Sequence, residues 1–205
     1  MKFRISRLTY YLQTGWALTK YFLKGPKIKF VFDRLEDLIE IKEIIIDREY
    51  HKLIGSISKK DRVIVDIGGG MGDFAILTAV EHPWTKIWSF EPDTKRFLLL
   101  KKNCENNSVK NVFALQEAAT NLELVSRMIG SKIDVLKIDC EGCEFDIIRS
   151  ATNKLLKGIR VIVMEYHSWA GDVNNLYNKL ENAGFKCTLI TRKGVPDLGL
   201  LLASR

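Results

Sequence analysis

A glycine-rich turn near the middle of this chain separates an apolar run from a helical one. The segment Asp66-Ile67-Gly68-Gly69-Gly70-Met71-Gly72 closes the run Val63-Ile64-Val65 and precedes the periodic residues 74–77. Glycine lets the backbone adopt positive φ and lets a ligand approach closely, because no Cβ stands in the way. The pattern predicts a strand, a tight turn and a helix in that order. Such a turn also occurs without a ligand, so the surrounding sequence has to decide what it binds.

Apolar runs alternate with helical segments through the rest of the chain. We expect strands at 62–67, 86–90, 111–116, 134–139 and 159–165, and helices at 33–54, 72–82, 93–106, 121–129, 143–155 and 172–184. This alternation predicts a mostly parallel sheet with right-handed crossovers and flanking helices, an α/β fold. Two further runs, Phe185–Thr191 and Leu198–Ala203, follow one another directly and predict an antiparallel pair at the edge of the sheet.

The charge of the chain is concentrated at its N-terminus. Residues 1–29 carry seven Lys or Arg and no acid, which equals the formal net charge of +7 for all 205 residues. We therefore expect an N-terminal helical extension at 1–55, basic at 1–29, and one domain at 56–205. An amphipathic helix at 7–23 would either lie on an anionic membrane or polyanion, or pack on the domain or a second copy. Packing is the interpretation that we favour.

Composition places the chain among soluble globular proteins. Hydrophobic residues make up 46% and charged residues 28%, and no apolar run approaches the roughly 20 residues needed to cross a bilayer. The basic N-terminus has no unbroken apolar stretch, so we expect no cleaved signal peptide. Four cysteines in this length do not predict a disulfide scaffold. We expect a cytoplasmic protein, with membrane-peripheral contact through 1–29 as an alternative.

Acidic residues end three of the predicted strands. Asp66, Glu91 and Asp139 should face one crevice, because ligands of open α/β sheets bind beyond the carboxyl ends of the strands. Glu91 lies about 20 residues beyond the glycines, where an acid can bind ribose hydroxyls. Asp66 and Asp73 beside the turn would repel a pyrophosphate but not a cationic ligand. S-adenosylmethionine carries an ammonium and a sulfonium group, so the charges favour it, and methyl transfer, over NAD.

A second acidic cluster follows the strand predicted at 134–139. Asp139, Glu141 and Glu144 lie within six residues. Methyl transfer to a hydroxyl requires alignment and benefits from a base, so Asp139, Glu141 and His167 are the catalytic candidates. His167 has a suitable unperturbed pKa, although a surface histidine is an equal alternative. The acids and the histidine could also gather a divalent metal, but we expect no metal site.

Three segments together closely resemble the FkbM family of S-adenosylmethionine-dependent methyltransferases. They are VIVDIGGGMGDFAIL at 63–77, FEPD at 90–93 and LKIDCEGCE at 136–144, and VMEYH at 163–167 also resembles the end of the family's fifth strand. The resemblance covers roughly residues 45–170. It implies the class I methyltransferase (Rossmann-like) fold, with seven strands of which the last is antiparallel.

The same resemblance implies where the cofactor lies. Its site would comprise Asp66, Gly68, Gly70, Gly72, Glu91, Glu117 and Asp139. The glycine turn would hold the methionine part, Glu91 the ribose, and Gln116-Glu117-Ala118 would border the adenine. Cys140 and Cys143 depart from the family pattern. A C-x-x-C pair can be a redox or metal site, but the family frame favours two packing residues.

Family members are often O-methyltransferases, so we expect methylation of a hydroxyl on a sugar or another small molecule. Two alternatives stay open. One is an RNA methyltransferase that uses the basic N-terminal segment, and the other is a non-catalytic cofactor-binding module. Nucleic acid is the less favoured partner, because basic residues are not spread over the catalytic region. An NAD-dependent oxidoreductase is disfavoured by Asp66 and Asp73.

Overall fold

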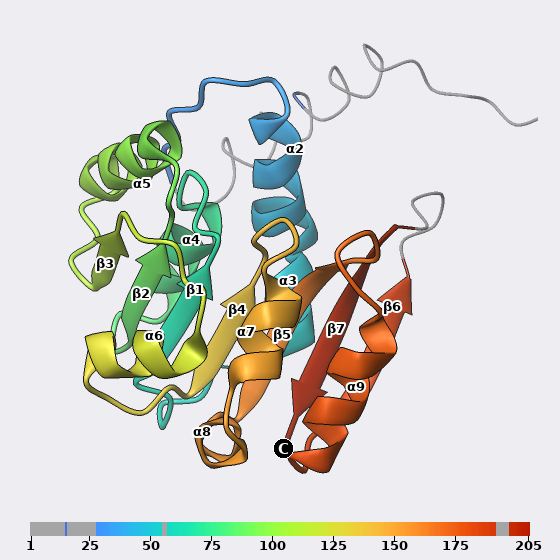
Figure 1. Ribbon diagram of the computed structural model, residues 1–205. Helices are drawn as coiled ribbons and strands as arrows, with labels where there is room; N and C mark the ends of the chain where they lie inside the picture. Colours follow the sequence, from blue (N-terminus) through green and yellow to red (C-terminus); the bar gives the residue numbers. More distant parts are fainter. Residues whose placement is uncertain (1–14, 16–27, 55–56, 192–196) are drawn as a thin grey trace, which may run out of the picture.

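The computed structural model of the protein describes residue 15 and residues 28–54, 57–191 and 197–205. One sheet of seven strands has the order β3-β2-β1-β4-β5-β7-β6 (Figure 1). The strands are β1 (Val63–Ile67), β2 (Lys86–Phe90), β3 (Val112–Leu115), β4 (Val135–Ile138), β5 (Val161–His167), β6 (Lys186–Thr191) and β7 (Leu198–Ser204). β1 to β5 pair in parallel, and β7 runs antiparallel to both β5 and β6. The predicted class I sheet is thereby confirmed.

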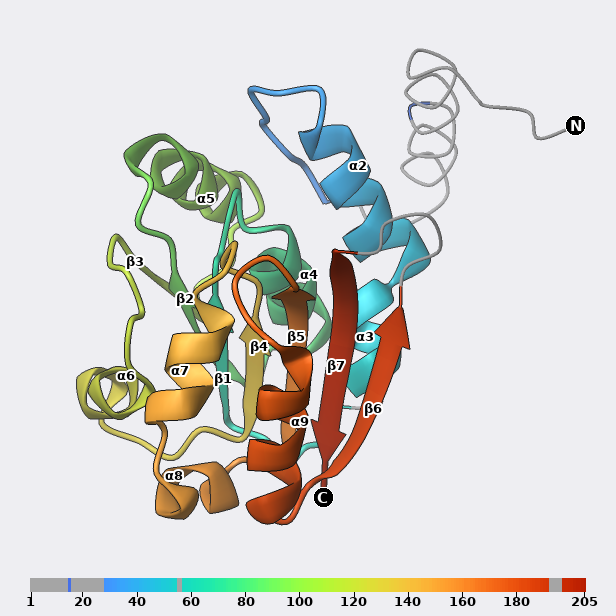
Figure 2. The ribbon, with the colours of Figure 1, turned by 45° about the vertical axis from the view of Figure 1, so that its right-hand side comes forward.

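Helices cover both faces of this sheet (Figures 1 and 2). One face packs against α6 (Leu122–Ile129), α7 (Glu144–Ser150), α8 (Asn153–Gly158) and α9 (Val173–Asn182). The other face packs against α2 (Asp37–Ile41), the π-helix η1 (Lys42–Asp47), α3 (Glu49–Ile54), α4 (Asp73–Glu81) and α5 (Thr94–Asn106). Because side chains alternate along a strand, Val63 and Val65 contribute to the first core and Ile64 to the second.

The N-terminal segment 28–54 is built into the second core. Ile41, Ile45 and Tyr50 are at most 2% exposed and pack in one cluster with Ile64 and Phe74. Residues 28–54 therefore pack on the sheet whose strand β1 leads into the glycine turn. The predicted amphipathic helix at 7–23 and most of the basic stretch 1–29 lie outside the described residues. Among the residues that are described, no helix is long and apolar enough to cross a membrane.

Two of the predicted helices are interrupted. The helix expected at 143–155 is wrong as a single element: Ala151 and Thr152 are extended, and the Thr152 side chain accepts a hydrogen bond from Leu155 N–H and so starts α8. The segment expected to be helical at 33–54 breaks at Arg48, which has a positive φ of 58°. Both breaks reflect local backbone geometry that hydrophobic periodicity does not encode.

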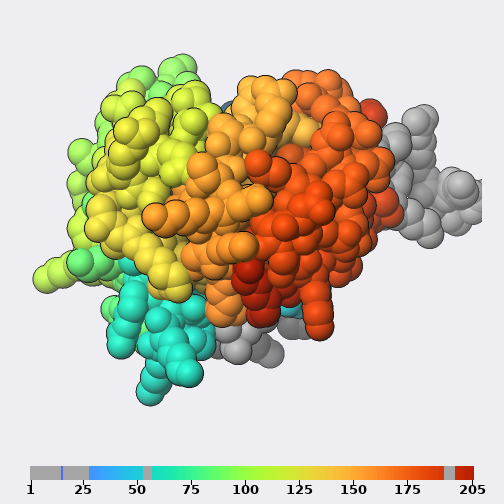
Figure 3. All heavy atoms as spheres, turned by 60° about the horizontal axis from the view of Figure 1, so that its bottom comes forward, coloured from blue at the N-terminus to red at the C-terminus, as the bar shows by residue number. Residues whose placement is uncertain are grey.

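The two ends of the sheet carry different segments of the chain. The carboxyl ends of β1, β2, β4 and β5 converge on one side, as the arrowheads in Figure 1 show. Figure 3 shows the opposite end, where the turn before β1, the helices α6 to α8 and the C-terminal strand come to the surface. The acidic and glycine-rich segments lie at the first of these ends.

Candidate active site

A cavity of about 500 Å³ opens at the carboxyl ends of the strands. Gly68 and Gly70 line it from the loop after β1, Glu91 from the end of β2, and Asp139 and Glu141 from the end of β4. Its far wall comes from the N-terminal segment, which contributes Arg34, Glu40, Glu43, Ile44, Glu49 and Tyr50. This size and position suit a small-molecule ligand of an open α/β sheet.

The glycine turn packs so closely on the end of β4 that Gly68 has no room for a side chain. A Cβ on Gly68 would lie 1.6 Å from the carbonyl oxygen of Asp139, and Gly68 has a φ of 77°. The backbone N–H groups of Gly68 and Gly69 both donate to the carbonyl of Phe90, at 3.0 and 2.9 Å. The Glu91 carboxylate accepts from Gly70 N–H at 2.8 Å. The ends of three strands are thus drawn close together around the cavity.

A buried ion pair supports the floor of the cavity. Lys137 Nζ lies 3.0 Å from Asp66 Oδ1 and donates to the Gly68 carbonyl at 2.7 Å. Asp66 is fully buried, and its other carboxylate oxygen accepts a hydrogen bond from Ser89 Oγ at 2.7 Å. Burial alone would lower the pKa of Lys137, but the charges of Asp66 and Asp139 outweigh it and raise that pKa. Lys137 therefore stays charged and fixes the glycine turn to β4.

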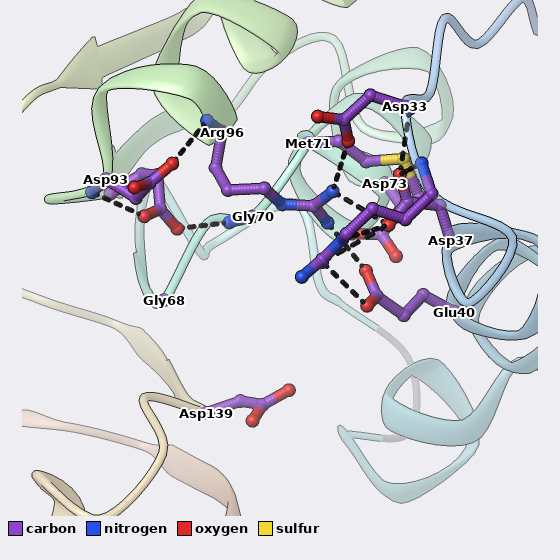
Figure 4. A network of polar contacts seen from close by, with 12 residues as sticks. Asp33, Asp37, Glu40, Gly68, Gly70, Met71, Asp73, Asp93, Arg96 and Asp139 are labelled. Atoms are coloured by element: carbon purple, nitrogen blue, oxygen red, sulfur yellow. Dashed lines mark hydrogen bonds and ion pairs between the residues drawn. The ribbon is translucent and has the colours of Figure 1, made fainter.

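Arg96 joins α5 to the N-terminal segment (Figure 4). Its guanidinium lies 2.7 Å from Asp37 Oδ1 and 2.8 Å from Glu40 Oε2, and both partners come from α2. Asp73, at the start of α4, lies beside this network. Burial raises the pKa of Asp73 to about 7, and the nearby charge of Glu40 acts in the same direction. Asp73 is thus poised to lose a proton when a cation enters the cavity.

Tyr50 connects the N-terminal segment to the acids at the ends of β4 and β5. Its hydroxyl donates to Asp139 Oδ2 at 2.8 Å and lies 3.4 Å from Glu165 Oε2. Burial and the two carboxylates raise the pKa of Tyr50 well above its ordinary value, so the hydroxyl remains a donor. Tyr50 was not among the site residues predicted from the sequence. Its position in the N-terminal segment, far along the chain from Asp139, carries no motif that could have revealed it.

His167 ends β5 between two carboxylates. Its Nδ1 lies 2.8 Å from Glu144 Oε1, and the same oxygen accepts the His167 backbone N–H at 2.8 Å. Its Nε2 lies 3.3 Å from Glu141 Oε2. The hydrogen bond with Glu144 raises the pKa of His167, and the charge of Glu141 adds to the effect. His167 is 3% exposed and is absent from the described cavity lining, so it supports Glu141 from behind.

The predicted site residues fall into two groups. Gly68, Gly70, Glu91, Asp139 and Glu141 line the cavity. The others lie behind it or beside it: Asp66 beneath the floor, Gly72 against Leu100 and Ile76, His167 behind Glu141, and Glu117 on the exposed surface. Next to Glu117, the residues that line the cavity are Ala118, Ala119 and Thr120.

Asp139, Glu165 and His167 are the described residues that could hold a metal ion. One ligand atom of each lies within 4.8 Å of the others. Lys137 Nζ lies 3.9 Å from Asp139 Oδ2, and the Tyr50 hydroxyl donates to the same oxygen, so a cation and a donor already face this carboxylate.

Comparisons with known proteins agree with this geometry. Residues 120–187 match the family model of the Methyltransferase FkbM domain. A protein of Beauveria bassiana called Methyltransferase 1 is 23% identical over 199 residues, which cover 70% of this chain and 79% of that protein. The resemblance predicted from the motifs is confirmed by both matches.

Solved structures share the fold. The METTL16 MTase domain superposes with a TM-score of 0.66 at 20% identity, covering 96% of this chain and 79% of that one. A putative methyltransferase from Streptococcus mutans in complex with SAH superposes with a TM-score of 0.60 at 11% identity, covering 77% and 96%. The chain thus resembles the Methyltransferase FkbM domain over residues 120–187 and has the class I methyltransferase fold.

Proposed function

We propose that the protein is an S-adenosylmethionine-dependent methyltransferase that methylates a hydroxyl group of a neutral small molecule such as a sugar. The observation that carries this proposal is the charge of the cavity. Among its described lining residues, three are cationic and eight are acidic: Arg34, Arg96 and Lys137 against Glu40, Glu43, Glu49, Asp73, Glu91, Asp139, Glu141 and Glu165. A cavity with this excess of carboxylates attracts cations and repels anions.

The residues present fit the cofactor. Gly68 and Gly70 expose backbone to the cavity, and the close approach of Gly68 to the Asp139 carbonyl admits no side chain there. Glu91 lies at the end of β2, in reach of a ribose, and Asp73 offers a carboxyl group that ionises near neutral pH. When bound, S-adenosylmethionine supplies an electrophilic methyl group on a positively charged sulfur. A dinucleotide would instead place its pyrophosphate among carboxylates, which is unfavourable.

The same charge bears on the methyl acceptor. A phosphorylated or carboxylated molecule would be repelled by Asp139, Glu141 and Glu165, whereas a polyhydroxylated molecule would find acceptors for its O–H groups. An RNA methyltransferase needs cations near the reacting base for the phosphate backbone. The described lining has only three, and Arg34 and Arg96 are paired with Asp37 and Glu40. This supports a neutral small molecule over RNA.

Two carboxylates are placed to touch the acceptor. Asp139 is partly exposed in the cavity, where the hydroxyl of Tyr50 fixes one of its oxygens. Glu141 also lines the cavity, and His167 holds it from behind. Either carboxylate can accept the proton that the acceptor hydroxyl loses. His167, whose ring nitrogens both face carboxylates, then acts as a positioning residue.

Calorimetry and a substrate panel test the proposal. S-adenosylmethionine and S-adenosylhomocysteine should bind to the purified chain, and NAD should not. Incubation with neutral sugars, sugar phosphates and total tRNA should form S-adenosylhomocysteine with the neutral compounds. Tight binding of NAD, with no binding of S-adenosylmethionine or S-adenosylhomocysteine, would refute the proposal. Turnover on tRNA that weakens steeply with salt would transfer the assignment to RNA.

Two variants test the catalytic residues. Glu141→Gln and Asp139→Asn should lower kcat, by about 10²–10⁴-fold for whichever residue is the base. The dissociation constant for S-adenosylhomocysteine should stay within a few-fold. Asp146→Asn, which removes an exposed acid on α7, is the matched control and should leave both quantities unchanged. Loss of cofactor binding with unchanged kcat at saturation would make the altered residue a cofactor ligand instead.

A further inference from the structure

The C-x-x-C pair is closed. Cys140 and Cys143 are joined by a disulfide, with their Cα atoms 5.5 Å apart. Both cysteines also pack against the first core, as expected, but the sequence did not predict the bond between them. The bond encloses only Glu141 and Gly142, and so short a loop gains little stability from closure, because the entropy that a disulfide removes grows with loop length. Stabilisation of the fold therefore does not explain this disulfide.

The enclosed loop belongs to the active site. Cys140, Glu141 and Cys143 all line the cavity. Glu141 has a positive φ of 55° and Gly142 a φ of 107°, so two successive residues are left-handed. A non-glycine residue adopts this conformation at a cost and needs neighbouring structure to hold it there. The disulfide supplies that constraint at the residue whose carboxylate meets His167.

The outer side of the loop is fixed by an aromatic ring. A Cβ on Gly142 would lie 2.6 Å from Cη2 of Trp169, so the ring rests directly on the loop backbone. Trp169 also lies edge-to-face with His167, with ring centroids 5.8 Å apart. It is 66% exposed, so one side of the ring remains open to solvent. A change in the loop would thus reach Trp169 and the contact between Glu141 and His167 together.

The other two cysteines behave differently. Cys104 and Cys187 are free thiols, and burial raises the pKa of each to about 11. A thiol with so high a pKa forms little thiolate, the species that reacts in disulfide exchange. These two cysteines provide an internal control in the same chain.

We propose that Cys140 and Cys143 form a reversible thiol–disulfide site that sets the conformation of the Glu141 loop and thereby the affinity of the cavity for its ligand. A dithiol reductant donates two electrons and two protons. The S–S bond breaks, each cysteine gains a thiol proton, and the reductant closes to its own disulfide. Opening the ring frees Glu141 from the left-handed conformation and loosens its contact with His167. The thiol–disulfide step stands on its own, whereas the effect on affinity rests on the proposed cofactor.

Differential alkylation and calorimetry test both parts. The full chain is equilibrated with oxidised or reduced dithiothreitol, alkylated and analysed by mass spectrometry. The peptide with Cys140 and Cys143 should gain two alkyl groups only after reduction. The dissociation constant for S-adenosylhomocysteine should differ between the two states by roughly fivefold or more, the usual lower range of coupling between sites. Linkage requires that saturating S-adenosylhomocysteine shift the disulfide equilibrium by the same factor.

Paired variants supply the controls. The double variant Cys140→Ala/Cys143→Ala should bind S-adenosylhomocysteine identically in both buffers, and Cys104→Ala/Cys187→Ala should keep the redox dependence. Free thiols at 140 and 143 after oxidation would overturn the site, and equal affinities in the two states would overturn its effect on the cavity. Absence of binding in both states would count against the proposed cofactor, and alkylation alone would then decide the thiol–disulfide site.

Discussion

Replacing Lys137 by methionine tests the account of the cavity floor. Lys137 is 4% exposed, and its ammonium is the cation closest to the fully buried Asp66 among the described ion pairs, at 3.0 Å. Methionine keeps most of the volume and the packing near the rings of Tyr50 and Phe74, which lie 5.6 and 5.9 Å from Nζ. The substitution therefore removes the paired charge and leaves Asp66 buried, with Ser89 as its side-chain donor among the described residues.

The expected cost is large. Breaking a buried ion pair on one side destabilises a protein by about 3–5 kcal/mol, because the remaining charge has no compensation. A domain of this kind has about 5–15 kcal/mol of unfolding free energy, so the loss is a substantial fraction. With a urea m-value of about 2–3 kcal/mol/M, the unfolding midpoint of Lys137→Met should fall by about 1–2 M.

Urea titration followed by circular dichroism measures this cost, and a second variant identifies its origin. Lys137→Met/Asp66→Asn removes both charges and should recover at least half of the lost unfolding free energy. A loss below about 1 kcal/mol in the single variant would refute the reasoning. So would a double variant as unstable as the single one.

The deficit should also depend on pH. Burial raises the pKa of Asp66 even with Lys137 present. Without Lys137 the folded state holds this proton more tightly than the unfolded state, whose aspartate pKa is about 3.9. The unfolding free energy that Lys137→Met loses therefore grows as the pH rises above the unfolded-state pKa. Its deficit relative to wild type should be smaller at pH 5 than at pH 8. A deficit that is constant between these two pH values would contradict the assignment to Asp66.

Three further predictions follow from the same site. Gly68→Ala should abolish S-adenosylhomocysteine binding or folding, because its Cβ would lie 1.6 Å from a carbonyl oxygen. Gly158→Ala should be tolerated, because the Lys132 side chain lies 3.9 Å from the position of its Cβ; calorimetry and circular dichroism of both variants decide. Asp73 has a pKa of about 7, so binding of cationic S-adenosylmethionine should release a proton and tighten from pH 6 to pH 8; equal binding enthalpies in buffers of different ionisation enthalpy would argue against this. Tyr50→Phe should lower kcat more than it changes cofactor affinity, because Asp139 loses its donor, whereas Tyr177→Phe should do neither.

The fold was predictable because its pattern is regular. Each predicted parallel strand overlaps an observed one, and the antiparallel pair β6–β7 occurs where alternation stops. Buried parallel strands read as continuous apolar runs between helical segments, so their order is visible in a single sequence. The break at Ala151 and Thr152 was not visible, because two residues in an extended conformation leave the apolar residues of α7 and α8 in place along the sequence.

The site was predictable only where residues are close to the ends of strands. The positions of Gly68, Glu91 and Asp139 follow from the topology, which brings the carboxyl ends of neighbouring strands together. Tyr50 and Arg96 come from helices whose orientation over the sheet depends on packing, and no local motif encodes it. The disulfide was missed for a different reason, since a C-x-x-C spacing is compatible with free, bonded or metal-bound cysteines alike.

The acids that lie at the strand ends form two groups in the structure, which differ in burial and in their ion-pair partners. Asp66 and Glu144 are fully buried, and each pairs with a basic side chain on a strand, Lys137 and His167 respectively. A carboxylate without water needs such a partner, so we expect these two acids to shape the site. Asp73, Asp139 and Glu141 line the cavity and remain accessible to what enters it. Substitutions in the first group should therefore lower the unfolding free energy, and substitutions in the second group should change ligand affinity or kcat. All five acids nevertheless lie at the same end of one sheet.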